Sequence, residues 1–215
     1  MLNIMKYVDH TLLKPFATWE DIAVLCEEAI LYQTASVCIP PNYVKRVSST
    51  YGGKLNICTV VGFPLGYAVT EAKLAECLQA FKDGANEIDM VINISDLKNK
   101  DYKKVLEEIT RVKKTVGRNI LKVIIETCYL TEEEKIEMCH IVTQAGADYI
   151  KTSTGFGTGG ARREDIELFK KHIGPKVKIK ASGGIRSLQD MENYIKAGCS
   201  RIGTSSAVKL IKEQT

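Results

Sequence analysis

Residues 145–156 read Ala-Gly-Ala-Asp-Tyr-Ile-Lys-Thr-Ser-Thr-Gly-Phe and predict three consecutive pieces of structure. The first glycine, Gly146, is typical of the residue that ends a helix. The run Tyr149–Ser153 predicts a short strand, and Thr154 begins a loop rich in hydroxyl groups and glycine. The same x-Gly-x junction precedes a predicted strand at residues 83–85 and 197–199, so helices and strands alternate along the chain.

Working outward from this segment, short runs rich in Val, Ile and Thr are separated by longer amphipathic segments. The predicted strands are Tyr7–Leu12, Ser36–Ile39, Asn56–Val61, Glu87–Asn93, Leu121–Thr127, Tyr149–Ser153, Lys178–Ser182 and Arg201–Thr204. Several of the intervening helices show recognisable starts. These starts are Thr18 with Asp21, Thr70 before a periodic run through Phe81, Thr131 with Glu134, and Ser187 with Asp190.

This βα rhythm predicts a (β/α)8 barrel. Eight units in 215 residues average about 27 residues each, which suits a TIM barrel, whereas a doubly wound sheet usually has fewer strands and often a second domain. No linker rich in Pro, Gly or Ser divides the chain. We therefore expect one TIM-barrel domain over residues 1–215.

Composition and charge argue against several classes of protein. The 30 basic and 26 acidic residues are interleaved, and aromatic residues make up only 7% of the chain, whereas a nucleic-acid-binding protein needs a clustered basic face with stacking aromatics. Apolar stretches such as Val123–Ile125 are the length of a strand, and Asp9 and His10 interrupt any signal-peptide core. We expect a cytoplasmic protein that binds neither nucleic acid nor membrane.

The cysteine pattern does not predict a metal site or a disulfide framework. The seven cysteines form an odd number and contain no C-x-x-C pair, and the three histidines lie far apart in the sequence. We expect reduced, buried thiols that pack as small hydrophobic side chains.

Two lysines on adjacent predicted strands, Lys151 and Lys180, are candidate catalytic residues. Burial and a neighbouring cation both disfavour the charged amine, so one of the two can become the neutral nucleophile that forms a Schiff base with a carbonyl. The alternative is that both side chains reach out to solvent, as most lysines do. Strand alternation leaves this open, because Lys180 shares its face with Lys178.

Asp89 lies within the otherwise apolar predicted strand Glu87–Asn93. A carboxylate buried in such a strand needs an ion-pair partner or a role in the chemistry. The structural alternative is an ion pair at the mouth of the barrel. The functional interpretation is proton transfer beside the amines, because an imine intermediate exchanges protons at carbon and oxygen.

Glycine-rich loops follow the last two predicted strands, where barrels commonly bind phosphate. Gly183, Gly184 and Gly203 free backbone N–H groups, and Ser205 and Ser206 add hydroxyls at the start of the last helix. The alternative is that one of these serines only caps that helix.

Five segments together resemble the deoxyribose-phosphate aldolase family over nearly the whole chain. The resemblance implies a class I aldolase on a TIM barrel that needs no metal or other cofactor and interconverts 2-deoxy-D-ribose 5-phosphate with glyceraldehyde 3-phosphate and acetaldehyde. It leaves the oligomeric state open, a homo-oligomer included. The segments are Asp9–Pro15, Glu87–Asn93, Leu121–Thr127, Lys151–Phe156 and Lys180–Arg186.

The resemblance also implies roles for single residues. It places the Schiff base on Lys151, the perturbing amine on Lys180 and the acid of the proton relay on Asp89. Cys38, Asp9 and Thr11 are implied to line or border the pocket. The residues expected to bind substrate or phosphate are Thr154, Gly155, Gly183, Gly184, Gly203, Ser205 and Ser206.

One departure and two alternatives remain. Some relatives have a C-terminal tail that ends in a tyrosine, whereas the last tyrosine here is Tyr194, so we expect any tail-assisted proton transfer to be absent or supplied by water. One alternative is a different Schiff-base aldolase or a transaldolase, which would use dihydroxyacetone units instead of acetaldehyde. The other is a barrel that binds a phosphorylated ligand without catalysis.

Overall fold

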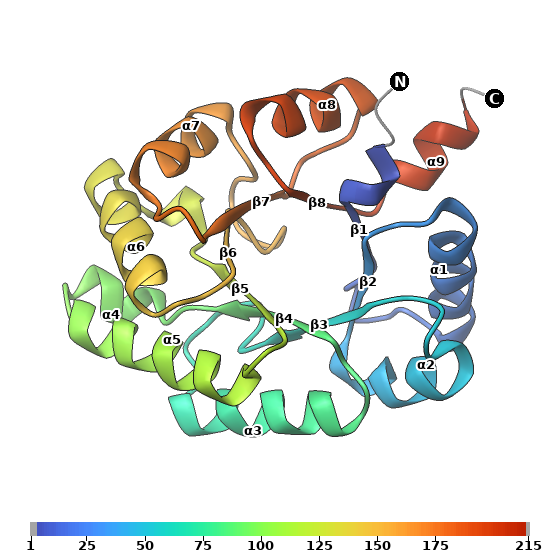
Figure 1. The fold of residues 1–215 in the computed structure, drawn as a ribbon, viewed down its shortest axis with the longest axis horizontal. Helices are drawn as coiled ribbons and strands as arrows, with labels where there is room; N and C mark the ends of the chain where they lie inside the picture. Colours follow the sequence, from blue (N-terminus) through green and yellow to red (C-terminus); the bar gives the residue numbers. More distant parts are fainter. Residues whose placement is uncertain (1–3, 214–215) are drawn as a thin grey trace.

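The computed structural model describes residues 4–213, and its eight strands close into one parallel barrel in sequence order (Figure 1). Each strand pairs with the next along the chain, and β1 also pairs with β8 through Asp9 and Gly203. The predicted TIM barrel is therefore confirmed. The strands are β1 (Val8–Thr11), β2 (Ser36–Ile39), β3 (Ile57–Val61), β4 (Glu87–Val91), β5 (Ile120–Ile124), β6 (Tyr149–Lys151), β7 (Lys178–Ser182) and β8 (Arg201–Thr204).

Helices surround the barrel on the outside (Figure 1). They are α1 (Trp19–Tyr32), α2 (Val44–Tyr51), α3 (Thr70–Lys82), α4 (Ile94–Lys98), α5 (Tyr102–Val116), α6 (Glu132–Gln144), α7 (Arg163–His172), α8 (Leu188–Ala197) and α9 (Ala207–Lys212). Short 3-10 turns lie at Ile4–Tyr7, Pro41–Tyr43 and Thr127–Tyr129. In the part of the chain described here, no helix combines the length and the apolar character needed to cross a bilayer.

Three of the four predicted helix starts are confirmed in detail. Thr18 and Thr131 each begin a helix through a reciprocal capping box, and the hydroxyl of Ser187 accepts the N–H of Asp190. Thr70 differs, because Val69 occupies the N-cap and Thr70 is already the first helical residue. That helix begins without a side-chain cap.

Several predicted strands extend too far at their C-terminal ends. β4 ends at Val91, and the side chain of Asn93 accepts the N–H groups of Ser95 and Asp96 to start α4. β6 ends at Lys151, so Thr152 and Ser153 already belong to the loop. A side-chain cap competes with the strand ladder for the backbone, and periodicity alone does not register this competition.

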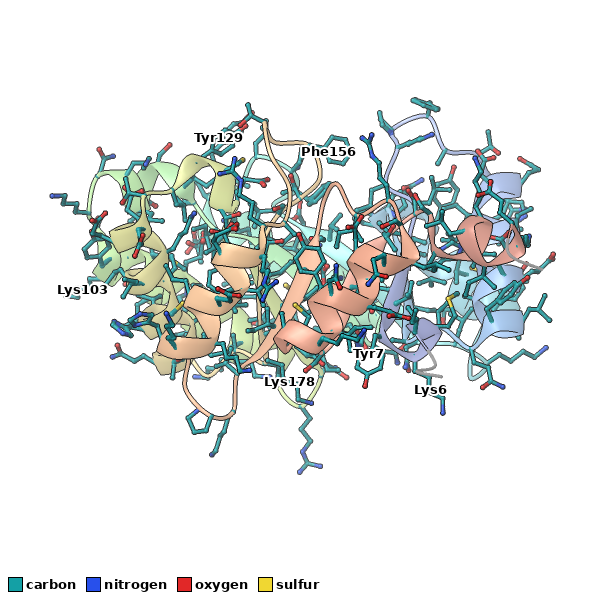
Figure 2. All side chains as sticks on the ribbon, turned by 90° about the horizontal axis from the view of Figure 1, so that it is seen from above. Lys6, Tyr7, Lys103, Tyr129, Phe156 and Lys178 are labelled. Atoms are coloured by element: carbon teal, nitrogen blue, oxygen red, sulfur yellow. The ribbon has the colours of Figure 1, made fainter. Side chains whose placement is uncertain are left out.

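The main hydrophobic core lies between the strands and the helices. On β4, Ile88 and Met90 face that core, while the alternating Glu87 and Asp89 lie among buried charged groups inside the barrel. Figure 2 shows Tyr129 and Phe156 at one end of the barrel and Tyr7 and Lys178 at the other. The loops that follow the strands gather at the end marked by Phe156, which is where TIM-barrel enzymes carry their active sites.

Candidate active site

The three residues expected to perform the chemistry meet inside the barrel. Lys151 on β6 and Lys180 on β7 occupy paired positions, and both amines donate to Oδ2 of Asp89 on β4 at 2.7 Å. Asp89 and Lys180 are fully buried, and Lys151 is 3% exposed. The alternative in which both lysines reach solvent is wrong.

Further charged groups extend this contact toward the other end of the barrel. Lys122 on β5, directly opposite Asp89 in the ladder, donates to Oδ1 of Asp89 at 3.0 Å and also to Glu87. Arg201 on β8 donates to Glu87 at 2.9 Å and to Asp9. We call this set the barrel charge cluster, and its members are Asp9, Glu87, Asp89, Lys122, Lys151, Lys180 and Arg201.

The cluster sets the ionisation of Asp89 and Lys180. Burial raises the pKa of Asp89, but Lys122, Lys151 and Lys180 outweigh this effect and hold the pKa well below its ordinary value. Burial lowers the pKa of Lys180, but Asp89 and Asp9 more than compensate and raise it above its ordinary value. Asp89 is therefore a carboxylate and Lys180 a cation at neutral pH.

Above Lys151 opens a cavity of about 290 Å³, here called the lysine cavity. Asp89, Lys180, Asp9 and Cys38 do not line it. The Lys180 amine contacts both Asp9 and Asp89, and the charges of Lys180 and Lys151 help to lower the pKa of Cys38. Nine of the residues expected at the site line it: Lys151, Thr11, Thr154, Gly155, Gly183, Gly184, Gly203, Ser205 and Ser206.

Two of the glycines are required by the backbone of this wall. Gly183 has φ +86°, a conformation that side chains with a Cβ rarely adopt. A Cβ on Gly203 would lie 2.9 Å from the Cβ of Ser182 and 3.1 Å from Cε of Lys180. Glycine at position 203 therefore leaves room for the buried lysine.

The two serines do not cap the last helix. Ser206 occupies the N-cap of α9 without a side-chain hydrogen bond, and its own N–H donates to Oγ1 of Thr204. Within residues 4–213, neither the Ser205 nor the Ser206 hydroxyl has a protein hydrogen-bond partner. Because α9 is only six residues long, this wall offers loop N–H groups and hydroxyls rather than the dipole of a long helix.

Cys38 and Cys58 lie side by side on β2 and β3 and are both fully buried. A hydrogen bond with Cys58 lowers the pKa of Cys38 despite burial. The two sulfurs and a carboxylate oxygen of Asp89 lie within 4.8 Å of one another, a spacing that a metal ion could bridge. Three lysine amines already contact that carboxylate, however, and their charge opposes a cation there.

Glu126 is a site residue that the sequence analysis missed. It is 2% exposed, and its carboxylate accepts the N–H of Thr154 at 3.2 Å and the Thr154 hydroxyl. Its φ of +53° is unusual for a residue with a side chain. No salt bridge joins it to a basic side chain in the described part of the chain, so this buried carboxylate is held by Thr154 of the β6–α7 loop and by the thiol of Cys128, which donates to it at 3.8 Å.

Lys122 and Arg201 were also given no role from sequence. The available signal for Lys122 was a lysine inside an apolar strand, in the segment Leu121–Thr127. Its partners are 33 and 35 residues away, and those of Arg201 are 114 and 192 residues away. Pairing of β4 with β5 brings Lys122 to its carboxylates, and closure of β8 on β1 brings Arg201 to Asp9.

Comparison with known proteins identifies the family of this site. The sequence description of the DeoC/LacD family aldolases matches residues 3–207. The chain belongs to this aldolase family. The aldolase is 69% identical to a deoxyribose-phosphate aldolase of Clostridium botulinum (strain Eklund 17B / Type B) over 98% of this chain and 95% of that protein. It is 58% identical to a deoxyribose-phosphate aldolase of Clostridioides difficile (strain 630), over 100% of this chain and 98% of that protein.

Solved structures agree with this assignment. The tetrameric deoxyribose phosphate aldolase from Aeropyrum pernix superposes with a TM-score of 0.91 at 33% identity, covering 98% of the aldolase and 90% of that chain. A structure described as QR15, an aldolase, superposes with a TM-score of 0.95 at 40% identity, covering 100% and 96%. The family thus places carbon–carbon lyase chemistry in this barrel.

Proposed function

We propose that this aldolase cleaves 2-deoxy-D-ribose 5-phosphate reversibly to glyceraldehyde 3-phosphate and acetaldehyde through a Schiff base on Lys151, without a metal ion. One observation carries the choice of nucleophile. Of the four basic groups in the barrel charge cluster, only Lys151 also lines the lysine cavity. A carbonyl in the cavity therefore meets this amine first.

Charge balance supports the same assignment. Four cations of the cluster face three carboxylates, so one positive charge is in excess. Lys122, Lys180 and Arg201 each contact at least two carboxylates, whereas Lys151 contacts Asp89 alone. Loss of a proton from Lys151 costs the fewest ion pairs and yields the neutral amine that attacks a carbonyl.

The chemistry then follows from the contacts of Asp89. The neutral Lys151 amine adds to the substrate aldehyde carbon, and loss of water gives the imine. The iminium withdraws electrons from the bond that breaks, and glyceraldehyde 3-phosphate leaves as the hydroxyl proton is removed. Asp89 and Lys180, joined at 2.7 Å, form the pair that accepts this proton and returns it to the enamine carbon, and one water then hydrolyses the imine to release acetaldehyde and the Lys151 amine.

The far wall of the lysine cavity suits the phosphate. Gly183 and Gly184 expose backbone N–H groups, and Ser205 and Ser206 offer free hydroxyls. Arg186 lies in the same wall and has no carboxylate partner in the described chain. A dianion bound there would place the sugar carbonyl toward Lys151.

Trapping tests this proposal. Borohydride reduction in the presence of acetaldehyde, followed by peptide mapping, should label Lys151 in wild type, and Lys151→Arg should remain folded but give no adduct. The activity should survive EDTA. Labelling of Lys180 instead would make the assignment of roles wrong, and no label at all would favour a barrel that only binds its ligand.

Donor choice separates the nearer alternative. Acetaldehyde should serve as donor with glyceraldehyde 3-phosphate, and dihydroxyacetone should not. Turnover with dihydroxyacetone as donor would instead indicate a transaldolase or another Schiff-base aldolase.

A further inference from the structure

The far wall of the lysine cavity is made by two neighbouring loops. The β7–α8 loop contributes Gly183 and Gly184, and the β8–α9 loop contributes Ser205 and Ser206. β7 and β8 pair in parallel along the barrel. The two loops therefore begin on adjacent strands at the same end of the barrel.

The β7–α8 loop has little stiffness of its own. Gly183 and Gly184 have φ values of +86° and +74°, which glycine adopts readily and other residues rarely adopt. Glycine also loses the most backbone freedom of any residue when it is ordered. An anion site made from these N–H groups therefore needs a contact from outside the loop that holds them in place before the ligand binds.

Thr204, the last residue of β8, makes such a contact. Its hydroxyl donates to the carbonyl of Ile185 in the β7–α8 loop at 3.0 Å and accepts the N–H of Ser206 in the β8–α9 loop at 3.1 Å. Among the residues that the structure describes, this is the one hydroxyl that bonds to both loops. A single oxygen atom thus ties the two parts of the wall together.

The hydroxyl of Thr204 is committed to the protein and not to a ligand. A threonine hydroxyl has one proton to donate, and the carbonyl of Ile185 takes it. Thr204 borders the lysine cavity but is only 7% exposed. Strand alternation turns its side chain away from the side that faces Lys180, where a Cβ on Gly203 would point. Thr204 therefore acts on a bound phosphate through the loops that it joins.

The start of α9 depends on the same oxygen. Ser206 occupies the N-cap of this helix without a side-chain hydrogen bond, and its own N–H is held by Thr204. A helix of six residues gains little stability from its own backbone hydrogen bonds. Without the Thr204 hydroxyl, the serines lose the contact that fixes them relative to the glycine N–H groups.

We infer that Thr204 is a positioning residue for the phosphate end of the substrate. Its hydroxyl holds the two loops at the spacing at which the N–H groups of Gly183 and Gly184 and the two serine hydroxyls reach one dianion. The inference rests on the proposed function, which places the phosphate at this wall. Loss of the hydroxyl should weaken phosphate binding and leave the reacting end at Lys151 unchanged.

Thr204→Val tests this inference, because valine keeps the branched shape and removes the hydroxyl. KM for deoxyribose 5-phosphate should rise about tenfold, with kcat changed less than about threefold. For unphosphorylated deoxyribose, kcat/KM should change less than about twofold. Binding of inorganic phosphate, measured by titration, should weaken about tenfold. Thr204→Ser restores the hydroxyl and should bring these values back to within about threefold of wild type.

Thr59→Val is the matched control. Thr59 on β3 is fully buried, and its hydroxyl donates to the carbonyl of Ile39 at 2.8 Å, but it does not line the lysine cavity. This substitution removes a comparable buried hydrogen bond, so it should lower the melting temperature without changing the preference for the phosphorylated sugar. If Thr204→Val fails to fold, Thr204→Ala removes the same hydroxyl and is judged by the same measurements.

Equal losses on both sugars in Thr204→Val, no recovery in Thr204→Ser, or unchanged binding of inorganic phosphate would overturn the inference. If acetaldehyde leaves no borohydride-trapped adduct on wild type, the proposed Schiff-base chemistry fails, whereas the titration with inorganic phosphate still decides the role of Thr204. The two failures are therefore seen in separate measurements.

Discussion

The amines of Lys151 and Lys180 contact the same oxygen, Oδ2 of Asp89, each at 2.7 Å. Two ammonium groups that share one oxygen repel each other, and burial strengthens the repulsion. Lys180 has a second carboxylate partner in Asp9, whereas Lys151 has none in residues 4–213. The repulsion is therefore relieved most easily when Lys151 gives up its proton.

Replacing Lys180 by Leu should lower kcat/KM by about 100-fold or more, because Asp89 then lacks the amine with which it is proposed to pass the proton. The measurement is kcat/KM for cleavage of deoxyribose 5-phosphate. Lys178→Leu is the control, because Lys178 begins the same strand but is exposed. Full activity in Lys180→Leu would show that the contact between Lys180 and Asp89 is not used in catalysis.

Asp89→Asn should reduce kcat by about 100-fold or more, because the amide keeps the shape but accepts no proton. Thermal unfolding should show a loss of stability as well, since three lysine amines lose a charged partner. Glu87, two residues earlier on β4, contacts Lys122 and Arg201 but not Lys151. Glu87→Gln should therefore reduce kcat less than Asp89→Asn does. An effect of Asp89→Asn confined to KM would instead indicate substrate positioning.

Ser206→Asp places a carboxylate in the wall proposed to hold the phosphate. The preference for deoxyribose 5-phosphate over unphosphorylated deoxyribose, measured as the ratio of kcat/KM values, should fall about tenfold or more. The unphosphorylated sugar is the internal control. Equal losses on both substrates would mean that the phosphate binds elsewhere.

Excess acetaldehyde should inactivate this aldolase through Cys38. Self-condensation of acetaldehyde gives an unsaturated aldehyde, and a thiolate adds to its double bond. The lowered pKa of Cys38 favours this reaction, although the side chain is fully buried. Cys38→Ala should retain activity during exposure, while Cys128→Ala, which removes a more accessible thiol, should remain sensitive; equal sensitivity of both variants would exclude Cys38 as the target.

Glu126→Gln should raise KM for the phosphorylated sugar by about tenfold while changing kcat much less. The amide weakens the hydrogen bonds that hold Thr154, and Thr154 orders the loop beside the cavity. Glu132→Gln, at the exposed start of α6, should have no effect. A fall in kcat at constant KM would place Glu126 in the chemistry itself rather than in positioning.

The order of the barrel strands follows from local features of the chain. Glycine junctions such as Ala145-Gly146-Ala147 end helices, and capping residues such as Thr131 begin them, so each βα unit is encoded by residues close together in sequence. The residue at which a strand ends is harder to predict from hydrophobic periodicity. β4 stops at Val91 because Asn93 caps the next helix, a competition that hydrophobic periodicity does not register.

The sequence by itself predicted Lys151, Lys180 and Asp89 as the reactive residues, through residue type and family resemblance, and the structure brings these three side chains together. Alternation could not decide which lysines point inward, because Lys178 and Lys180 share a face of β7. The tertiary structure decides this by position along the barrel axis: Lys178 lies exposed at the end opposite Phe156, and Lys180 lies buried further along the strand, between two carboxylates.

Lys122, Arg201 and Glu126 are placed in the site only by the tertiary structure. Arg201 meets Asp9 from 192 residues away when β8 closes on β1, whereas Lys122 meets Asp89 when β5 pairs with β4. Glu126 depends on a left-handed backbone conformation that residue type does not predict. Local propensity thus determines the helices and strands and their order along the chain. The long-range pairing of buried charges, which must compensate one another in a low dielectric, determines which residues come together in the site.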